Sequence, residues 1–134
     1  MNLLRPLIYL WALPNTLLGL LFFLPTLLTR GKMQIVDGVL ELHGGVTTWF
    51  LTKPVGLFLQ GGASAMTLGH VVLGRDADAL KRTRKHERVH VRQCERWGPL
   101  FLPAYLGVSL WLRLQKKDAY YDNPFEREAY RIAP

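Results

Sequence analysis

Two histidines with a glutamate beside the first form the part of the sequence best suited to chemistry. They occur in an H-E-x-x-H pattern, His86-Glu87-Arg88-Val89-His90. Residues four apart on a helix lie one turn apart on the same face, so both imidazoles can bind one zinc ion. Glu87 lies on the adjoining face, where it can take a proton from a water that zinc has brought to a pKa of about 7. The motif predicts a Zn²⁺-dependent hydrolytic site.

A catalytic zinc ion needs a third protein ligand besides two histidines, and an open position. Glu126 and Glu128 are the candidates, and they follow a helix start at Asn123-Pro124. Cys94 lies one turn beyond the motif and would reach the ion only if the helix were distorted. Glu126 has an alternative role, since at position N3 it can complete a capping box with Asn123. We favour Glu126 as the ligand, because the zinc site would otherwise be incomplete.

The segment that carries the motif is predicted to be one long helix from Ala77 to Trp97. Asp76 or Asp78 can cap its start, and a Gly-Pro pair ends it. One side carries a basic stripe, made of Lys81, Lys85, Arg88, Arg92 and Arg96. This stripe is typical of a solvated face or of a surface that meets anionic lipid headgroups. We expect no nucleic acid partner, because no recognised nucleic-acid-binding motif accompanies the charge.

Strands are predicted on the amino-terminal side of this helix. Residues 34–36 and 39–42 are predicted strands, joined by Asp37-Gly38, which suits a tight hairpin. Residues 67–73, Thr67 to Leu73, indicate a further strand shortly before the helix. The fold class predicted from these elements is α+β.

A long apolar run precedes these elements. Residues 7–29, from Leu7 to Thr29, include no charged side chain and are long enough to cross a hydrocarbon core of about 30 Å. A buried core helix or a cleaved signal peptide explains the run less well. Pro14 and Asn15 interrupt it, so both a kinked transmembrane helix and a re-entrant helical hairpin remain open. We therefore divide the chain into a membrane segment, residues 1–32, and a domain, residues 33–134.

The charge balance bears on location. Lys and Arg number 17 against 10 Asp and Glu, for a net charge of +7, although 49% of the residues are hydrophobic. Most of the positive charge follows the apolar run, which predicts a membrane protein with its domain in the cytoplasm. A second apolar run, residues 99–114, is shorter and favours a buried or interfacial helix. A single cysteine excludes a disulfide scaffold.

The predicted strand, the H-E-x-x-H helix and the later segment Phe125-Glu126-Arg127-Glu128-Ala129 together resemble the gluzincin metallopeptidases, particularly the minimal and integral-membrane members. The resemblance extends from residue 63 to the C-terminus. It implies a small zincin-like core whose edge strand, here residues 69–73, pairs with the substrate backbone. It also implies site residues by position, namely the zinc ligands His86, His90 and Glu126 and the general base Glu87.

Two other positions follow from this resemblance. His70 would lie in the substrate-binding strand and is a candidate catalytic residue, whereas Tyr130 stands where the family has an Asp that orients a ligand histidine. The predicted function is that of a membrane-anchored zinc metallopeptidase, with membrane lipid and a polypeptide substrate or protein partner. The alternatives are a non-catalytic zinc-containing membrane protein and a zinc hydrolase acting on a non-peptide amide or ester.

Overall fold

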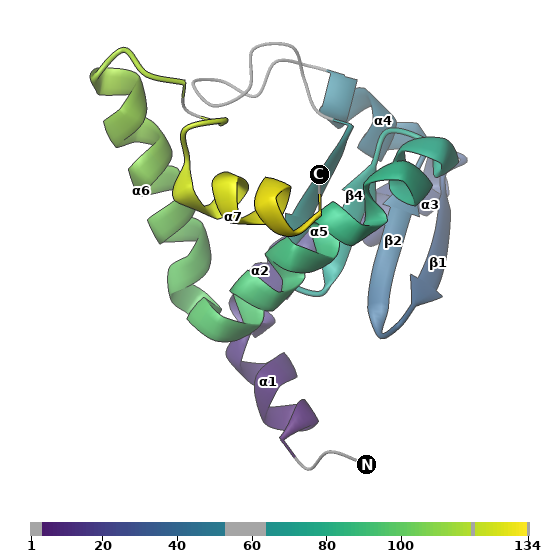
Figure 1. Ribbon diagram of the computed structural model, residues 1–134. Coiled ribbons are helices and arrows are strands. Elements are labelled where there is room, and N and C mark those ends of the chain that lie inside the picture. Colours follow the sequence, from purple (N-terminus) through teal and green to yellow (C-terminus); the bar gives the residue numbers. More distant parts are fainter. Residues whose placement is uncertain (1–3, 53–63, 119, 134) are drawn as a thin grey trace.

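The computed structural model describes residues 4–52, 64–118 and 120–133 and has an α+β fold (Figure 1). One mixed sheet has the strand order β1-β2-β4-β3. Its strands are β1 (Lys32–Val36), β2 (Val39–His43), β3 (Ala65–Leu68) and β4 (Val71–Gly74). The helices are α1 (Arg5–Trp11), α2 (Leu13–Leu20), α3 (Phe23–Leu28), α4 (Gly45–Thr52), α5 (Ala77–Trp97), α6 (Phe101–Leu114) and α7 (Pro124–Ile132), with a 3₁₀ turn at Gly98–Leu100.

Helices cover both faces of the sheet. Successive residues of a strand point to opposite faces, and in β4 the residues on both faces are buried. In β4, Val72 belongs to a buried cluster with Leu80 of α5. Its neighbours Val71 and Leu73 belong to a different cluster, which includes Leu51 of α4. Helix α2 contacts β3 and β4, and α3 contacts β1 and β2, so the amino-terminal helices form part of this second layer.

The hairpin predicted at residues 34–42 is confirmed, and the single strand predicted at residues 67–73 is wrong. Asp37 and Gly38 have positive φ angles of 52° and 78° in the turn between β1 and β2. Gly69, with φ of 65°, starts a second turn that divides residues 65–74 into the antiparallel strands β3 and β4. The edge strand beside α5 is therefore β3, whereas β4 lies inside the sheet between β2 and β3.

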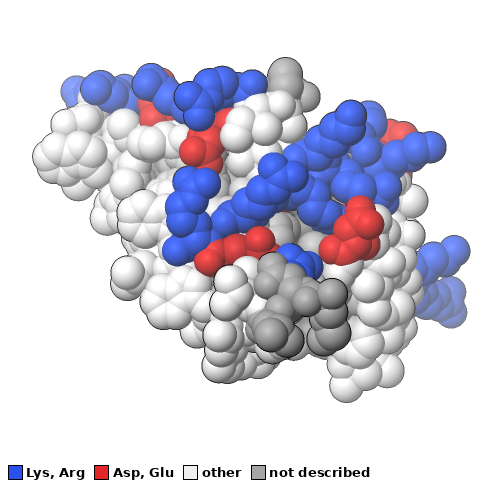
Figure 2. Space-filling model, turned by 60° about the horizontal axis from the view of Figure 1, so that its bottom comes forward, with Lys and Arg blue, Asp and Glu red and all other residues white. Residues whose placement is uncertain are grey.

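Helix α5 begins and ends as the sequence predicts. The Asp76 side chain accepts a hydrogen bond of 2.7 Å from the backbone N–H of Ala79, and Gly98 follows the last turn with φ of 59°. The basic side chains of the helix contribute to a continuous band of Lys and Arg on the surface (Figure 2).

One member of the basic stripe has a different role from the solvated one predicted. The guanidinium of Arg88 donates to Glu41 of β2 at 3.0 Å, and Arg84 donates to the same carboxylate at 2.9 and 3.0 Å. The Glu41 residue is fully buried. Arg84, Arg88 and Glu41 therefore form an ion triad that ties α5 to the sheet.

The first apolar run is broken into α1, α2 and α3. Among the described residues, no single helix is both long and apolar enough to cross a membrane. Helix α1 and the segment Leu13–Leu28 meet the length and composition criteria only together, with a bend of 67° between them. The second apolar run forms the 3₁₀ turn and α6, and only Phe101, Ser109 and Leu112 of α6 are buried.

Candidate metal centre

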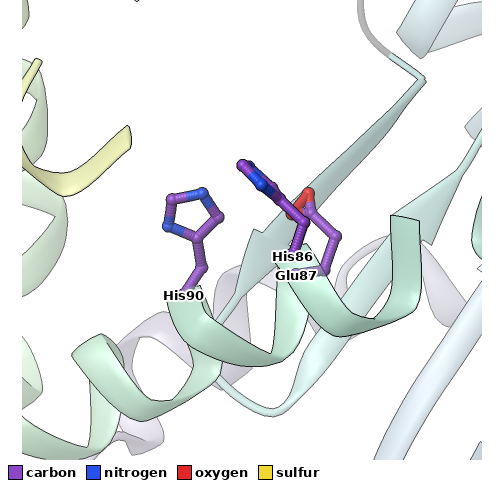
Figure 3. Close-up of side chains that lie close together, drawn as sticks. All are labelled: His86, Glu87 and His90. Carbon is purple, nitrogen blue, oxygen red and sulfur yellow. The ribbon is translucent and has the colours of Figure 1, made fainter. Parts of the chain in front are cut away.

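Three side chains of the H-E-x-x-H motif converge at the surface of α5. One potential ligand atom from each of His86, Glu87 and His90 lies within 4.8 Å of the other two. Glu87 and His90 are buried, and the His86 side chain is 12% exposed. Figure 3 shows the three side chains projecting from the same side of the helix. This group can hold a metal ion.

Glu126 of α7 faces the same point. Its Oε1 atom lies 3.2 Å from Nε2 of His86 and 3.0 Å from Nε2 of His90. The capping box considered above does not form with Asn123, whose side chain accepts from Phe125 N–H and whose own N–H donates to Tyr120 O. The Glu126 carboxylate is therefore free to face the histidines, and its Oε2 accepts a bond of 2.6 Å from the Tyr105 hydroxyl.

Outer hydrogen bonds determine which nitrogen of each histidine faces Glu126. Nδ1 of His90 lies 2.8 Å from Oε1 of Gln93, and Nδ1 of His86 lies 3.2 Å from the carbonyl oxygen of Ala133. Both partners are acceptors, so each Nδ1 carries a proton that points outward, and each Nε2 faces Glu126. Such outer partners fix the orientation of ligand histidines in metal sites.

Gln93 is itself held in one orientation. Its Nε2 donates to the Phe125 carbonyl oxygen at 3.0 Å and to Glu128 Oε1 at 2.9 Å. Because both of these partners are acceptors, the amide oxygen must be the atom that faces His90. A chain of hydrogen bonds thus runs from the half-buried Glu128 through the buried Gln93 to His90.

Two other ligand candidates considered from the sequence do not face the histidines. Glu128 contacts Gln93 and approaches Arg96 at 3.8 Å. Cys94 packs in a buried cluster with Ala12 and Phe101, and burial raises the pKa of its thiol to about 12. A protonated thiol is a poor metal ligand. Glu126 is thus the carboxylate of α7 that the fold brings to the motif.

The electrostatics of the cluster favour an ionised carboxylate at Glu126 and a protonated imidazole at His90. Burial alone would raise the pKa of Glu126, but hydrogen bonds from His86 and His90 lower it to about 2. Burial alone would lower the pKa of His90, but its bond to Glu126 and the nearby Glu87 raise it to about 9. A buried carboxylate beside two inward-facing Nε2 atoms is the donor chemistry of a divalent metal site.

Glu87 lies between this cluster and the sheet. Thr67 of edge strand β3 donates to the Glu87 backbone oxygen at 3.3 Å, and its hydroxyl is 3.5 Å from the Glu87 carboxylate. Burial is the largest influence on the Glu87 carboxyl and raises its pKa. A carboxyl group of raised pKa beside a metal site is suited to accepting and releasing a proton.

His70 is not brought to this cluster. It lies in the turn between β3 and β4, where its Nε2 is 2.8 Å from Glu95 and its ring stacks on Tyr9 at 3.9 Å. These residues line a separate cavity of about 210 Å³, together with Arg5 and Arg92. The expected place of His70 in a substrate-binding strand is wrong, because the chain turns at Gly69.

Tyr130 does not take the place of the Asp found in gluzincins. Its ring packs against His86 with centroids 4.4 Å apart, and its hydroxyl is 3.1 Å from that of Tyr120. The orienting bonds come from Ala133 and Gln93 instead. The sequence offered a signal for Gln93, since it lies three residues after His90 and hence on nearly the same helix face.

A pair of variants on α7 tests the ligand assignment. We expect Glu126→Gln to weaken zinc binding by more than about 100-fold, beyond the loss typical of an outer partner. The matched control, Glu128→Gln, lies on the same helix and should weaken it by less than about 100-fold through Gln93. Competition with a chromophoric chelator measures both affinities. Equal affinities in the two variants would exclude Glu126 as a ligand.

Comparison of the chain with known protein families, curated proteins and solved structures finds no match.

Proposed function

We propose that this protein is a zinc-dependent metallopeptidase with a zincin-like core. One observation carries the proposal: Nε2 of His86 and Nε2 of His90 both face Glu126, while Glu87 lies beside them next to an edge strand. These groups would supply three ligands and a base, which is the set needed for metal-assisted hydrolysis.

His86, His90 and Glu126 would hold the metal ion. Zinc bound there would polarise a peptide carbonyl and make a water molecule nucleophilic near neutral pH. Glu87 takes the proton of the attacking water and later delivers it to the leaving amine. Its burial supports both transfers, because a raised pKa brings the carboxyl group closer to the pH at which it must exchange protons.

Strand β3 would position the substrate. Within residues 4–52, 64–118 and 120–133 it pairs with β4 on one side only, so among these residues its other edge has backbone groups available for an extended peptide. The contact between Thr67 and Glu87 places this strand directly beside the proposed base. The substrate-binding role that the resemblance implied for residues 69–73 is therefore assigned to Ala65–Leu68.

Removal and return of the metal tests this function. Full-length protein in mild detergent, treated with a chelator, should lose its cleavage of a mixed peptide library, and stoichiometric zinc should restore it. Magnesium should not restore it, because two imidazoles and a carboxylate favour zinc. Mass spectrometry of the products measures cleavage.

Two outcomes would contradict the proposal. If zinc binds stoichiometrically and raises the melting temperature but no peptide is cleaved, the metal has a structural role. If zinc restores hydrolysis of model esters or non-peptide amides alone, the protein is a hydrolase of another substrate class. A parallel assay on such substrates separates these results.

A further inference from the structure

The amino-terminal helices expose their large apolar residues and bury their small and polar ones. Every leucine between residues 7 and 29 is exposed, at values from 36% for Leu13 to 75% for Leu28. The buried residues of this segment are small or polar instead: Ala12, Asn15, Gly19 and Thr26. A helix on the surface of a water-soluble domain turns its leucines inward. Here they point away from the protein.

Specific contacts hold the small and polar side against the domain. Nδ2 of Asn15 donates to the Gly98 carbonyl oxygen at 2.7 Å, and the hydroxyls of Thr26 and Thr47 lie 2.6 Å apart. Gly19 approaches the sheet so closely that an added Cβ would lie 2.6 Å from Cβ of Val71. Outward-facing leucines are therefore a consequence of how α2 and α3 pack on the sheet.

We propose that the outer side of α1–α3 lies in the hydrocarbon of a single membrane leaflet, so that the protein is attached to one side of a bilayer without crossing it. The leucine face is defined by Leu7, Leu10, Leu13, Leu17, Leu18, Leu20, Leu21, Leu24, Leu27 and Leu28. Exposure of ten leucines on three successive helices is unusual for a soluble monomer, and large exposed apolar patches mark a membrane or protein interface.

The position of the sheet determines the mode of attachment. The segment Leu13–Leu28 is about 24 Å long at 1.5 Å per residue, less than a hydrocarbon core of about 30 Å. Its inner side is covered by the sheet and α4. If it stood upright across the bilayer, it would carry sheet backbone into hydrocarbon, where polar groups go unsatisfied. The helices must lie along the membrane surface, with lipid on one side and the domain on the other.

The charge distribution favours lipid over a second copy of the chain as the occupant. Arg5 lies at one end of the leucine face, Arg30 and Lys32 follow the other, and residues 7–29 have no charge. Exposed basic residues that flank an apolar surface match the anionic headgroups around a buried helix. Two copies joined through this face would instead bring these like charges together.

Vesicle binding tests the leucine face without any measurement of hydrolysis, so its result is independent of the proposed peptidase activity. We expect the triple variant Leu17→Ser, Leu21→Ser and Leu28→Ser to bind phosphatidylcholine–phosphatidylglycerol vesicles at least about 100-fold more weakly in flotation assays. A matched double variant, Ile35→Ser with Ile132→Ser, removes exposed apolar side chains elsewhere and should bind like the original protein. Circular dichroism and thermal unfolding report whether each variant is folded.

Binding of the folded triple variant at the original strength would overturn the proposal. So would a detergent-free protein that forms a stable dimer and leaves vesicles unbound, because a second copy would then cover the face. If the triple variant fails to fold, depth-dependent quenching by brominated lipids decides, measured on a protein in which Trp49, Trp97 and Trp111 are replaced by Phe so that Trp11 is its one tryptophan. The proposal requires strong quenching of that side chain, which is 47% exposed beside the leucine face.

Labelling of introduced cysteines separates attachment to one leaflet from a transmembrane arrangement. Leu4→Cys and Met33→Cys mark the two ends of the run, and native Cys94 is buried. A membrane-impermeant maleimide should label both variants to the same extent in intact cells. After permeabilisation the extent of labelling should again be the same for both. Labelling of one end alone in intact cells would establish a crossing and overturn the proposal.

Discussion

Replacement of Glu87 by glutamine is expected to lower kcat for peptide hydrolysis by about 10²- to 10⁴-fold, the usual contribution of a general base. The substitution keeps the size of the side chain but removes its ability to accept a proton. Zinc affinity should be nearly unchanged, because His86, His90 and Glu126 would supply the ligands. Steady-state kinetics and chelator competition measure the two quantities separately.

A control on the same helix strengthens this experiment. Glu95→Gln changes a carboxylate that contacts His70 and Arg5, outside the metal cluster. Its kcat should stay close to that of the original protein. Unchanged turnover in the Glu87→Gln protein would contradict the mechanism, whatever the metal affinity.

Loss of the Glu41 charge should have the largest effect on stability. We expect Glu41→Gln to lower the free energy of unfolding by about 3 kcal/mol, at the lower end of the range for a broken buried ion pair. The Arg88 side chain is only 15% exposed and would lose its charged partner, whereas Arg84 is 31% exposed and can turn toward water. Urea denaturation of the full-length protein measures the change.

Acid should reproduce part of this loss in the original protein. Burial raises the pKa of Glu41, but hydrogen bonds from Arg84 and Gln34 outweigh it and keep the pKa below its usual value. A carboxyl group with a lowered folded-state pKa stabilises the protein above its unfolded-state pKa, and this contribution is lost as the pH falls through the folded-state value. Glu41→Gln should lack this part of the pH dependence.

The exposed ion pair of Asp78 and Arg82 provides the control. These side chains are 76% and 62% exposed, and Asp78→Asn should change stability by less than about 1 kcal/mol. If the Glu41 and Asp78 variants were equally stable, the buried triad would have no special role.

Local signals in the sequence were sufficient to predict the helix borders around the site. In the structure Asp76 and Asn123 cap their helices and Gly98 ends α5. Such borders can be predicted because a cap depends on side chains within a few residues. The turn at Gly69 was missed, since a single glycine within an apolar stretch looks like part of a strand. Its positive φ angle became evident only from the pairing of β3 with β4.

Contacts between distant segments could not be predicted in the same way. Glu41 meets Arg84 and Arg88 across more than forty residues, and no local pattern indicates that a strand glutamate is buried there. The metal site was easier to predict, because the spacing of His86 and His90 lies within a single helix. The approach of Glu126 was expected from chemistry alone, since a third ligand was required, whereas the acceptor role of Ala133 depends on the position of the last turn of α7.

Helix α2 also contacts the turn that joins β3 to β4. The Thr16 hydroxyl accepts the His70 N–H at 3.0 Å, and an added Cβ on Gly69 would lie 2.5 Å from the Thr16 nitrogen. Proteolytic removal of residues 1–30 would therefore uncover the part of the sheet that α2 and α3 contact and leave the strand beside Glu87 without this support. We expect such a fragment to unfold, so the proposed enzyme could not be released by cleavage after the leucine face and would act only where that face is held.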